Sequence, residues 1–374
     1  LTAYGQFSAQ ADVKSGFYEF DTSYGVEDEA DTLNRAYVLG WQHQLGHWQH
    51  QAQLSRNLDS EATFGPGSRS PFVTARDEFS YQAASSITDS VSFFGGINWY
   101  QEQVDKSATA YEQTSRVNRA LFTGITYQQS ALQLEAAARR DLTAQYGGQN
   151  TWQLAAGYQL AEHWRVRASR GTAFKAPTFN DLYYPGFANP DLKPEESVSD
   201  EVAVSYQNPG LTVQLAWFDR DVTNLIQGVE QAENVLLATI EGVEFSLKQQ
   251  WRQFNSQFAY SWLDTENSST GTKLARRPEN TLNWRGSYDA DKWSVFITAD
   301  YQSETYQGID WVTGLDLPQA PTHTLWGVGG SYVVTDALTL RAKVDNLFDK
   351  DYFTSHSYAT AGTTFGISLS YTPR

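Results

Sequence analysis

The feature that most constrains the fold is an alternation of apolar and polar residues with a period of two. Near the C-terminal end, Leu338, Leu340 and Ala342 alternate with Thr339 and Arg341. Such an alternation over about ten residues predicts a β-strand with one apolar and one polar face. No segment shows the apolar spacing of an amphipathic helix. The same alternation is present in the segments 132–139, 164–169, 293–301 and 364–371.

The predicted strands are joined by short turns that alternate with longer polar segments. Two long strands and one tight turn repeat about every 40 residues, which gives about 18 antiparallel strands in all. The tight turns are predicted near Gly46, Asp89, Gln129, Glu162, Pro209, Trp251, Asp291 and Asp336. The longer polar segments are predicted at 12–34, 58–76, 173–197, 221–239, 304–322 and 348–361.

A repeat of this length is also typical of a β-propeller, whose blades each have four short strands. Here each repeat holds two long strands, no blade signature recurs, and Arg and Lys alternate along faces that a propeller would bury. Short turns on one side and long loops on the other are typical of an outer-membrane β-barrel, in which closure pairs every backbone group. We therefore predict an all-β fold, an antiparallel transmembrane β-barrel.

The aromatic content favours a membrane location. The 374 residues include 12 Trp, 21 Tyr and 20 Phe, although the chain is polar on average, with a mean hydropathy of −0.50. Indole and phenol rings prefer the membrane–water interface because they are apolar with one polar tip. A soluble β core is the alternative, but it would bury the alternating charged residues. The tryptophans predicted to form interfacial girdles are Trp41, Trp48, Trp99, Trp152, Trp164, Trp251, Trp284 and Trp293.

Composition excludes several other classes of protein. The chain has no Cys, and therefore no disulfide and no thiolate ligand or nucleophile. Its net charge of −16 argues against a nucleic-acid partner, because binding phosphates requires a basic surface. No apolar run is long enough for a transmembrane helix. The sequence lacks G-x-S-x-G, H-E-x-x-H and phosphate-loop motifs, so we predict no enzyme. An outer-membrane barrel enzyme that assembles Ser/His or Asp/His pairs from separate strands is the alternative.

Two segments resemble a known family. The first is A-S-R-G-T-A-F-K-A-P-T-F-N-D-L-Y at 168–183 with N-P-D-L-K-P-E at 189–195, and the second is V-D-N-L-F-D-K-D-Y at 344–352 with Y-A-T-A-G at 358–362. Both resemble the barrel of TonB-dependent outer-membrane receptors, and within that family the cobalamin receptors most. Such receptors hold a plug domain inside a 22-stranded barrel. The resemblance implies that residues 1–374 are one barrel domain, incomplete at its N-terminal end and without the plug. A complete 18-stranded diffusion porin is the alternative.

The resemblance also implies where a ligand binds. Arg276 and Tyr358 match ligand-contacting positions of the cobalamin receptors, and a guanidinium at the first position can donate to amide or phosphate oxygens. Tyr306 and Trp311 lie on a loop that reaches the ligand in the family. The alternative is an Arg of the barrel wall paired with Glu279, with rim aromatics that have no special role.

The most acidic segment, 12–34, suggests a metal site. Clustered carboxylates on a loop suit Ca²⁺, which takes six to eight oxygen ligands. In cobalamin receptors Ca²⁺ orders such loops, and by resemblance Asp21 and Asp31 are its candidate ligands. A solvated acidic loop is the alternative.

Three histidines, His43, His47 and His50, surround the turn near Gly46. His43 and His50 are symmetric about this turn, so they are expected to be cross-strand neighbours on the apolar face. We predict interfacial residues there rather than a Zn²⁺ site.

The expected function is energised uptake of a bulky, scarce solute, most closely cobalamin, with a ferric siderophore as the alternative inside the family. The resemblance implies three partners: the small-molecule ligand, outer-membrane lipid, and the TonB energy-coupling protein through a plug segment that this chain lacks. We predict no covalent cofactor.

Overall fold

The computed structural model describes residues 3–19, 27–65, 68–228, 231–310, 313–356, 358 and 360–372. Within these residues it has 18 β-strands and one short helix, so the all-β prediction and the strand number are confirmed. Each established strand pair from β1 to β8 and from β13 to β18 is antiparallel and joins neighbours in the chain. No helix in the described part of the chain is long and apolar enough to cross a membrane.

The chain forms two compact units. The first unit comprises Leu1–Tyr158, Ala168–Asp200 and Arg220–Ala238, and the second comprises Gln159–Arg167, Glu201–Asp219 and Thr239–Arg374. The elements up to the helix are β1 (Ala3–Glu19), β2 (Glu27–Leu45), β3 (Trp48–Gly65), β4 (Ser68–Ser86), β5 (Val91–Ser107), β6 (Ser115–Gln129), β7 (Leu132–Thr143), β8 (Gly147–Ala161), β9 (Trp164–Lys175) and α1 (Phe179–Tyr183).

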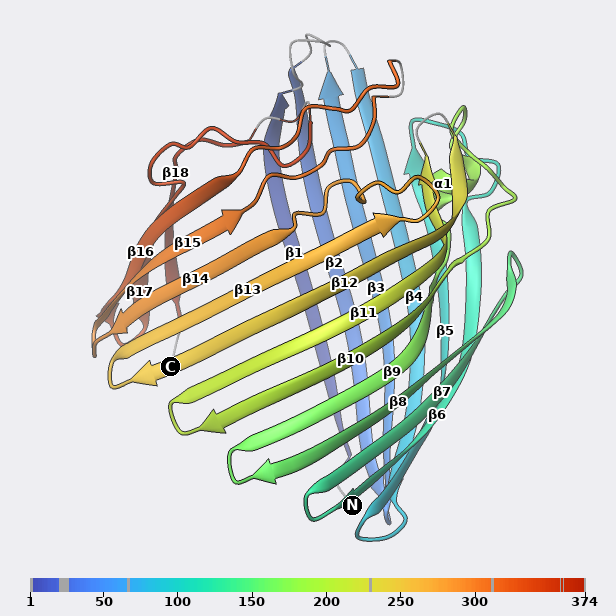
Figure 1. Cartoon of the computed structure of the whole chain (residues 1–374), viewed down its shortest axis with the longest axis vertical. Helices are drawn as coiled ribbons and strands as arrows, with labels where there is room; N and C mark the ends of the chain where they lie inside the picture. The colour runs from blue at the N-terminus through green and yellow to red at the C-terminus, as the bar shows by residue number, and fades with distance from the viewer. Residues whose placement is uncertain are drawn as a thin grey trace. The chain divides into compact units, whose positions relative to one another are not determined.

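The elements after the helix are β10 (Glu195–Asn208), β11 (Leu211–Gly228), β12 (Ala232–Trp251), β13 (Phe254–Asn267), β14 (Asn280–Asp289), β15 (Trp293–Gln302), β16 (His323–Thr335), β17 (Leu338–Asp345) and β18 (Thr364–Tyr371). In Figure 1, β13 to β16 lie side by side as consecutive hairpins of the second unit. The predicted tight turns are present: Gly46 connects β2 to β3 with φ +60°, where glycine avoids the strain of a side chain.

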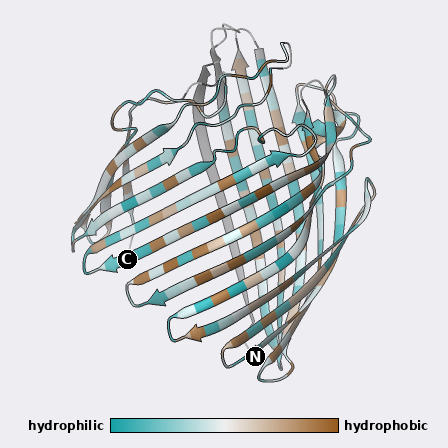
Figure 2. Ribbon diagram, in the orientation of Figure 1, coloured by the Kyte–Doolittle hydropathy of each residue, from teal (hydrophilic) through white to brown (hydrophobic). Residues whose placement is uncertain are grey.

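The strands have one apolar and one polar face, as the period of two predicts. Teal and brown residues follow one another along the strands in Figure 2. On β8 the apolar side chains of Trp152 and Leu154 are exposed to the surroundings, at 39% and 54%. Few apolar side chains are deeply buried, and most of those are alanines. An exposed apolar face of this kind is what lipid, rather than a protein core, requires.

Aromatic rings form a row at the tight-turn end of the second unit. Trp251 stacks on Phe254 with ring centroids 6.1 Å apart, Phe254 meets Tyr288 at 4.9 Å, and Tyr288 meets Trp293 at 5.3 Å. We call Trp251, Phe254, Tyr288 and Trp293 the aromatic row. Its position, next to the turns and on the apolar face, is that of an interfacial girdle.

The strands of the first unit are longer than predicted. Most of the segment 12–34, predicted as a loop, is strand, because β1 extends to Glu19 and β2 begins at Glu27. The segments 58–76 and 221–239 are likewise mostly strand. Backbone pairing continues there, for example between Asp12 and Asn34. A strand that extends beyond the membrane has water on both faces, so both faces can be polar. The apolar–polar alternation is then absent from the sequence, although the backbone is still paired.

Candidate functional site

Three loops of the second unit make one connected layer. We call the segments 268–279, 303–322 and 346–363 the loop layer. The Arg276 backbone N–H donates to the Tyr306 carbonyl at 2.7 Å, which joins the first two loops. The Gln307 side chain joins the second loop to the third: its Oε1 accepts from the His356 N–H at 3.1 Å, and its Nε2 donates to the Thr354 carbonyl at 3.5 Å. The Gln307 side chain is buried, with 3% exposure, so the hydrogen bonds that join the second and third loops lie inside the layer.

The layer contains three of the four predicted ligand residues. Arg276 is exposed and has φ +59°, and its backbone N–H is the group that donates to the Tyr306 carbonyl. Tyr358 is 42% exposed, two residues after His356. Trp311 lies outside the described residues. The structure therefore brings Arg276 and Tyr306 together and places Tyr358 in the same layer, while their role in binding stays a prediction. Within the described part of the chain, no ion pair joins Arg276 to Glu279.

The Tyr306 side chain forms a hydrogen bond within its own loop. Its hydroxyl donates to Asp316 Oδ1 at 3.2 Å. Burial and this hydrogen bond raise the pKa of the Tyr306 phenol above its ordinary value. The group is therefore a neutral donor and acceptor at physiological pH.

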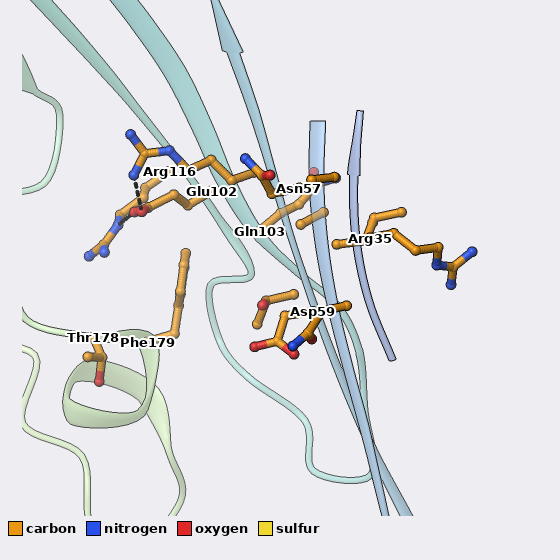
Figure 3. Close-up of a pocket in the computed structure, with 14 residues that line it drawn as sticks. Arg35, Asn57, Asp59, Glu102, Gln103, Arg116, Thr178 and Phe179 are labelled. Carbon is orange, nitrogen blue, oxygen red and sulfur yellow. Dashed lines mark hydrogen bonds and ion pairs between the residues drawn. The ribbon is translucent and has the colours of Figure 1, made fainter. Parts of the chain in front are cut away.

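A cavity in the first unit was not predicted from the sequence. It has a volume of about 650 Å³ and lies on the polar face of β2 to β6 (Figure 3). Strand register places Ala36, Asn57, Arg76, Glu102 and Arg116 in one row across these five strands. Arg35, on the opposite parity, directs its side chain away from the others in Figure 3.

The short helix α1 covers one side of this cavity through Thr178 and Phe179. Thr178 and Asp181 form a capping box: the Asp181 N–H donates to Thr178 Oγ1 at 3.2 Å, and the Thr178 N–H donates to Asp181 Oδ2 at 2.7 Å. Tyr111 fastens the helix from the β5–β6 loop, since its hydroxyl donates to Asn180 Oδ1 at 2.5 Å. Burial and the nearby Tyr184 raise the pKa of the Tyr111 phenol.

Both charge signs line the cavity. Arg116 donates to Glu102 at 2.7 Å and to the Pro177 carbonyl at 2.5 Å, and its guanidinium lies 5.0 Å from the Phe179 ring. Arg76 pairs with Glu102 at 3.3 Å. Because these charges satisfy one another, the cavity suits a polar ligand with donors and acceptors better than a strongly charged one.

The structure describes one of the two predicted metal ligands. Asp31 lies on β2, opposite Ser15 and Ala62, rather than on a loop, and Asp21 lies outside the described residues. Among the residues with defined positions, no group of three or more His, Asp or Glu could hold a metal ion. The described residues thus do not make a Ca²⁺ site, and the Ca²⁺ interpretation stays a prediction.

His43 and His50 are cross-strand neighbours, as predicted. His43 stacks on Trp41 with ring centroids 5.7 Å apart, and His50 Nδ1 lies 2.8 Å from the Tyr81 hydroxyl. Both imidazoles are thus part of an aromatic cluster on the apolar face.

The family model and similar curated proteins point to the same family. The family model described as "TonB dependent receptor-like, beta-barrel" matches residues 2–347. The chain is 31% identical over 382 residues to the vitamin B12 transporter BtuB of Photobacterium profundum, covering 98% of this chain and 62% of that protein. It is 29% identical to BtuB of Vibrio vulnificus, covering 89% of this chain and 55% of that protein. The chain thus spans less than two thirds of the length of these relatives.

Solved structures agree on the fold. A mutant of the ferric enterobactin receptor PfeA from Pseudomonas aeruginosa, in complex with enterobactin, has a TM-score of 0.76 at 18% identity and covers 98% of this chain and 71% of that one. The FrpB iron transporter from Neisseria meningitidis has a TM-score of 0.78 at 12% identity and covers 99% and 70%. The chain therefore belongs to the TonB-dependent receptor-like β-barrel family, and it is an outer-membrane protein.

Proposed function

We propose that this chain is the barrel of a TonB-dependent transporter that takes up cobalamin. The observation that carries the proposal is the 31% identity with a vitamin B12 transporter over 98% of this chain. The ferric enterobactin receptor and the FrpB iron transporter share the fold at below 25% identity, so the ligands in their names do not bear on this proposal.

Side chains of the loop layer are suited to the contacts that cobalamin would require. A guanidinium carries only donors and stays charged at every relevant pH, so Arg276 is suited to carbonyl and phosphate oxygens. The Tyr306 and Tyr358 phenols offer flat apolar surface with one polar tip, which suits a large macrocycle. These groups bind and orient a solute and perform no covalent step. TonB, proposed as partner on family membership alone, would supply the energy for release.

Equilibrium binding of cyanocobalamin to the full-length protein tests the proposal. Arg276→Ala removes a charged donor, and we expect affinity to fall roughly 10- to 100-fold, since hydrogen bonds to charged groups contribute about 1.5–3 kcal/mol. Tyr358→Ala is expected to weaken binding in the same direction. The matched control is Arg277→Ala, which removes the neighbouring exposed guanidinium and is expected to leave affinity within about twofold.

Three results would contradict the proposal. Binding of a ferric chelate in place of cobalamin would favour a siderophore receptor. Steady ion conductance in planar bilayers would favour the diffusion porin. Lipase or protease turnover by the solubilised protein would favour a barrel enzyme.

A further inference from the structure

A second cavity lies on the apolar face of the second unit, away from the loop layer. It has a volume of about 520 Å³ and is formed by β12 to β16 next to the tight turns. Register pairs Ser256 with Gly286 at its floor, and Phe254 with Tyr288 at its edge near the turns. Trp284 forms the opposite wall. We call this cavity the rim groove. Its volume is within the range of about 300–1,000 Å³ that is typical of small-molecule sites.

The groove exists because one position in the sheet has no side chain. A Cβ atom at Gly286 would lie 2.8 Å from Cζ2 of the Trp284 ring, closer than real atoms approach. The indole N–H donates to Ser256 Oγ at 3.2 Å, which fixes the ring along the edge of the gap and uses its polar atom. Ile297 and Val328 complete an apolar lining. The groove is thus shaped for hydrocarbon.

The surroundings of the groove identify its occupant. Trp251 and Phe254 are 61% and 52% exposed, and both belong to the aromatic row. In an outer-membrane protein such a row marks the interface, and the short turns beyond it face the periplasm. The groove is therefore continuous with the lipid-facing surface, at the depth where phospholipid acyl chains meet their headgroups.

A basic residue stands at the polar end of the groove. Arg252 is at the tip of the β12–β13 turn with φ +54°, and its guanidinium lies 5.5 Å from the Trp251 ring. The turn after β14 is adjacent, because the Asp289 N–H donates to the Gln253 carbonyl at 2.9 Å. The Asp289 carboxylate accepts from Asn255 at 2.7 Å and from Ser287 at 3.2 Å, which are both on the polar face. The Asp289 carboxylate therefore does not occupy the Arg252 guanidinium, whose positive charge is complementary to a phosphate.

We propose that the rim groove is a binding site for one phospholipid of the periplasmic leaflet. One acyl chain lies over Gly286 between Trp284 and the aromatic row, and the phosphate contacts Arg252. This site is independent of the proposed cobalamin transport, since it shares no residue with the loop layer.

Native mass spectrometry of the full-length protein extracted from outer membranes tests the site. The measured quantity is the fraction of protein that retains one phospholipid after detergent exchange. Gly286→Leu fills the groove and is expected to abolish retention. The control Ala138→Leu introduces the same side chain on the apolar face of β7 beside Trp152, and it is expected to retain lipid as the parent does.

Arg252→Gln keeps the groove open and changes only an exposed turn. It is expected to weaken retention about fivefold, the effect of one basic residue near a lipid phosphate. It also keeps the test decisive if Gly286→Leu fails to fold. Equal retention by Arg252→Gln and the parent would overturn the phosphate contact, and equal retention by a folded Gly286→Leu would overturn the site. Competition by soluble glycerophosphate would show a free-phosphate site instead of a lipid site.

Discussion

At the scale of single residues, the polar face of the sheet depends on a few buried charges. Asp141 on β7 is 2% exposed and accepts from Asn118 at 2.6 Å and from the Arg139 guanidinium at 2.7 and 2.8 Å. Asp141→Ala leaves the buried Asn118 amide without its acceptor, and we expect the free energy of unfolding to fall by roughly 1–3 kcal/mol. Urea unfolding in phospholipid vesicles, followed by Trp fluorescence, measures it.

The control for this prediction is Asp345→Ala on β17. Asp345 pairs with Lys343, but both side chains are more than half exposed, so the expected loss is below about 1 kcal/mol. Equal losses in the two variants would contradict the argument. The sequence does not single out Asp141, because Glu135 and Arg139 occupy equivalent polar positions and only cross-strand register decides which charge is buried.

At the scale of elements, α1 is one helical turn held by its cap. Thr178→Ala removes the side chain that accepts from Asp181 N–H, which costs about 1 kcal/mol. We expect faster amide hydrogen exchange at Leu182 and Tyr184, whose N–H groups donate to Thr178 and Asn180 carbonyls. Thr178→Ser keeps the hydroxyl and is expected to exchange as the parent does. Unchanged exchange in Thr178→Ala would show that Tyr111 alone fixes the helix.

Strands with a sustained apolar–polar alternation were predictable. The one-turn helix, and the strand ends whose two faces both meet water, were not. The hairpins around Gly46 and Pro209 follow from alternation and turn residues, whereas a single helical turn is too short to show a period. Only the capping pattern of Thr178 and Asp181 could have indicated α1. The candidate ligand residue Arg276 was predicted from family resemblance. The row from Asn57 to Arg116 needs the register of three successive strand pairs, and an error of one residue in any turn reverses the face.

At the scale of the whole molecule, the two faces of the sheet meet different solvents, and neighbouring residues test this directly. Leu154 on β8 is on the apolar face, paired with Ala136, and Gln153 is on the polar face, paired with Ala137. An arginine facing lipid costs roughly 2–4 kcal/mol near the bilayer midplane, whereas one on the polar face stays hydrated. We therefore expect Leu154→Arg to lower the unfolding free energy in vesicles by that amount, and Gln153→Arg to change it by less than about 1 kcal/mol. Both variants carry the same added charge at adjacent positions, so equal effects would mean that net charge, not the face, sets the cost.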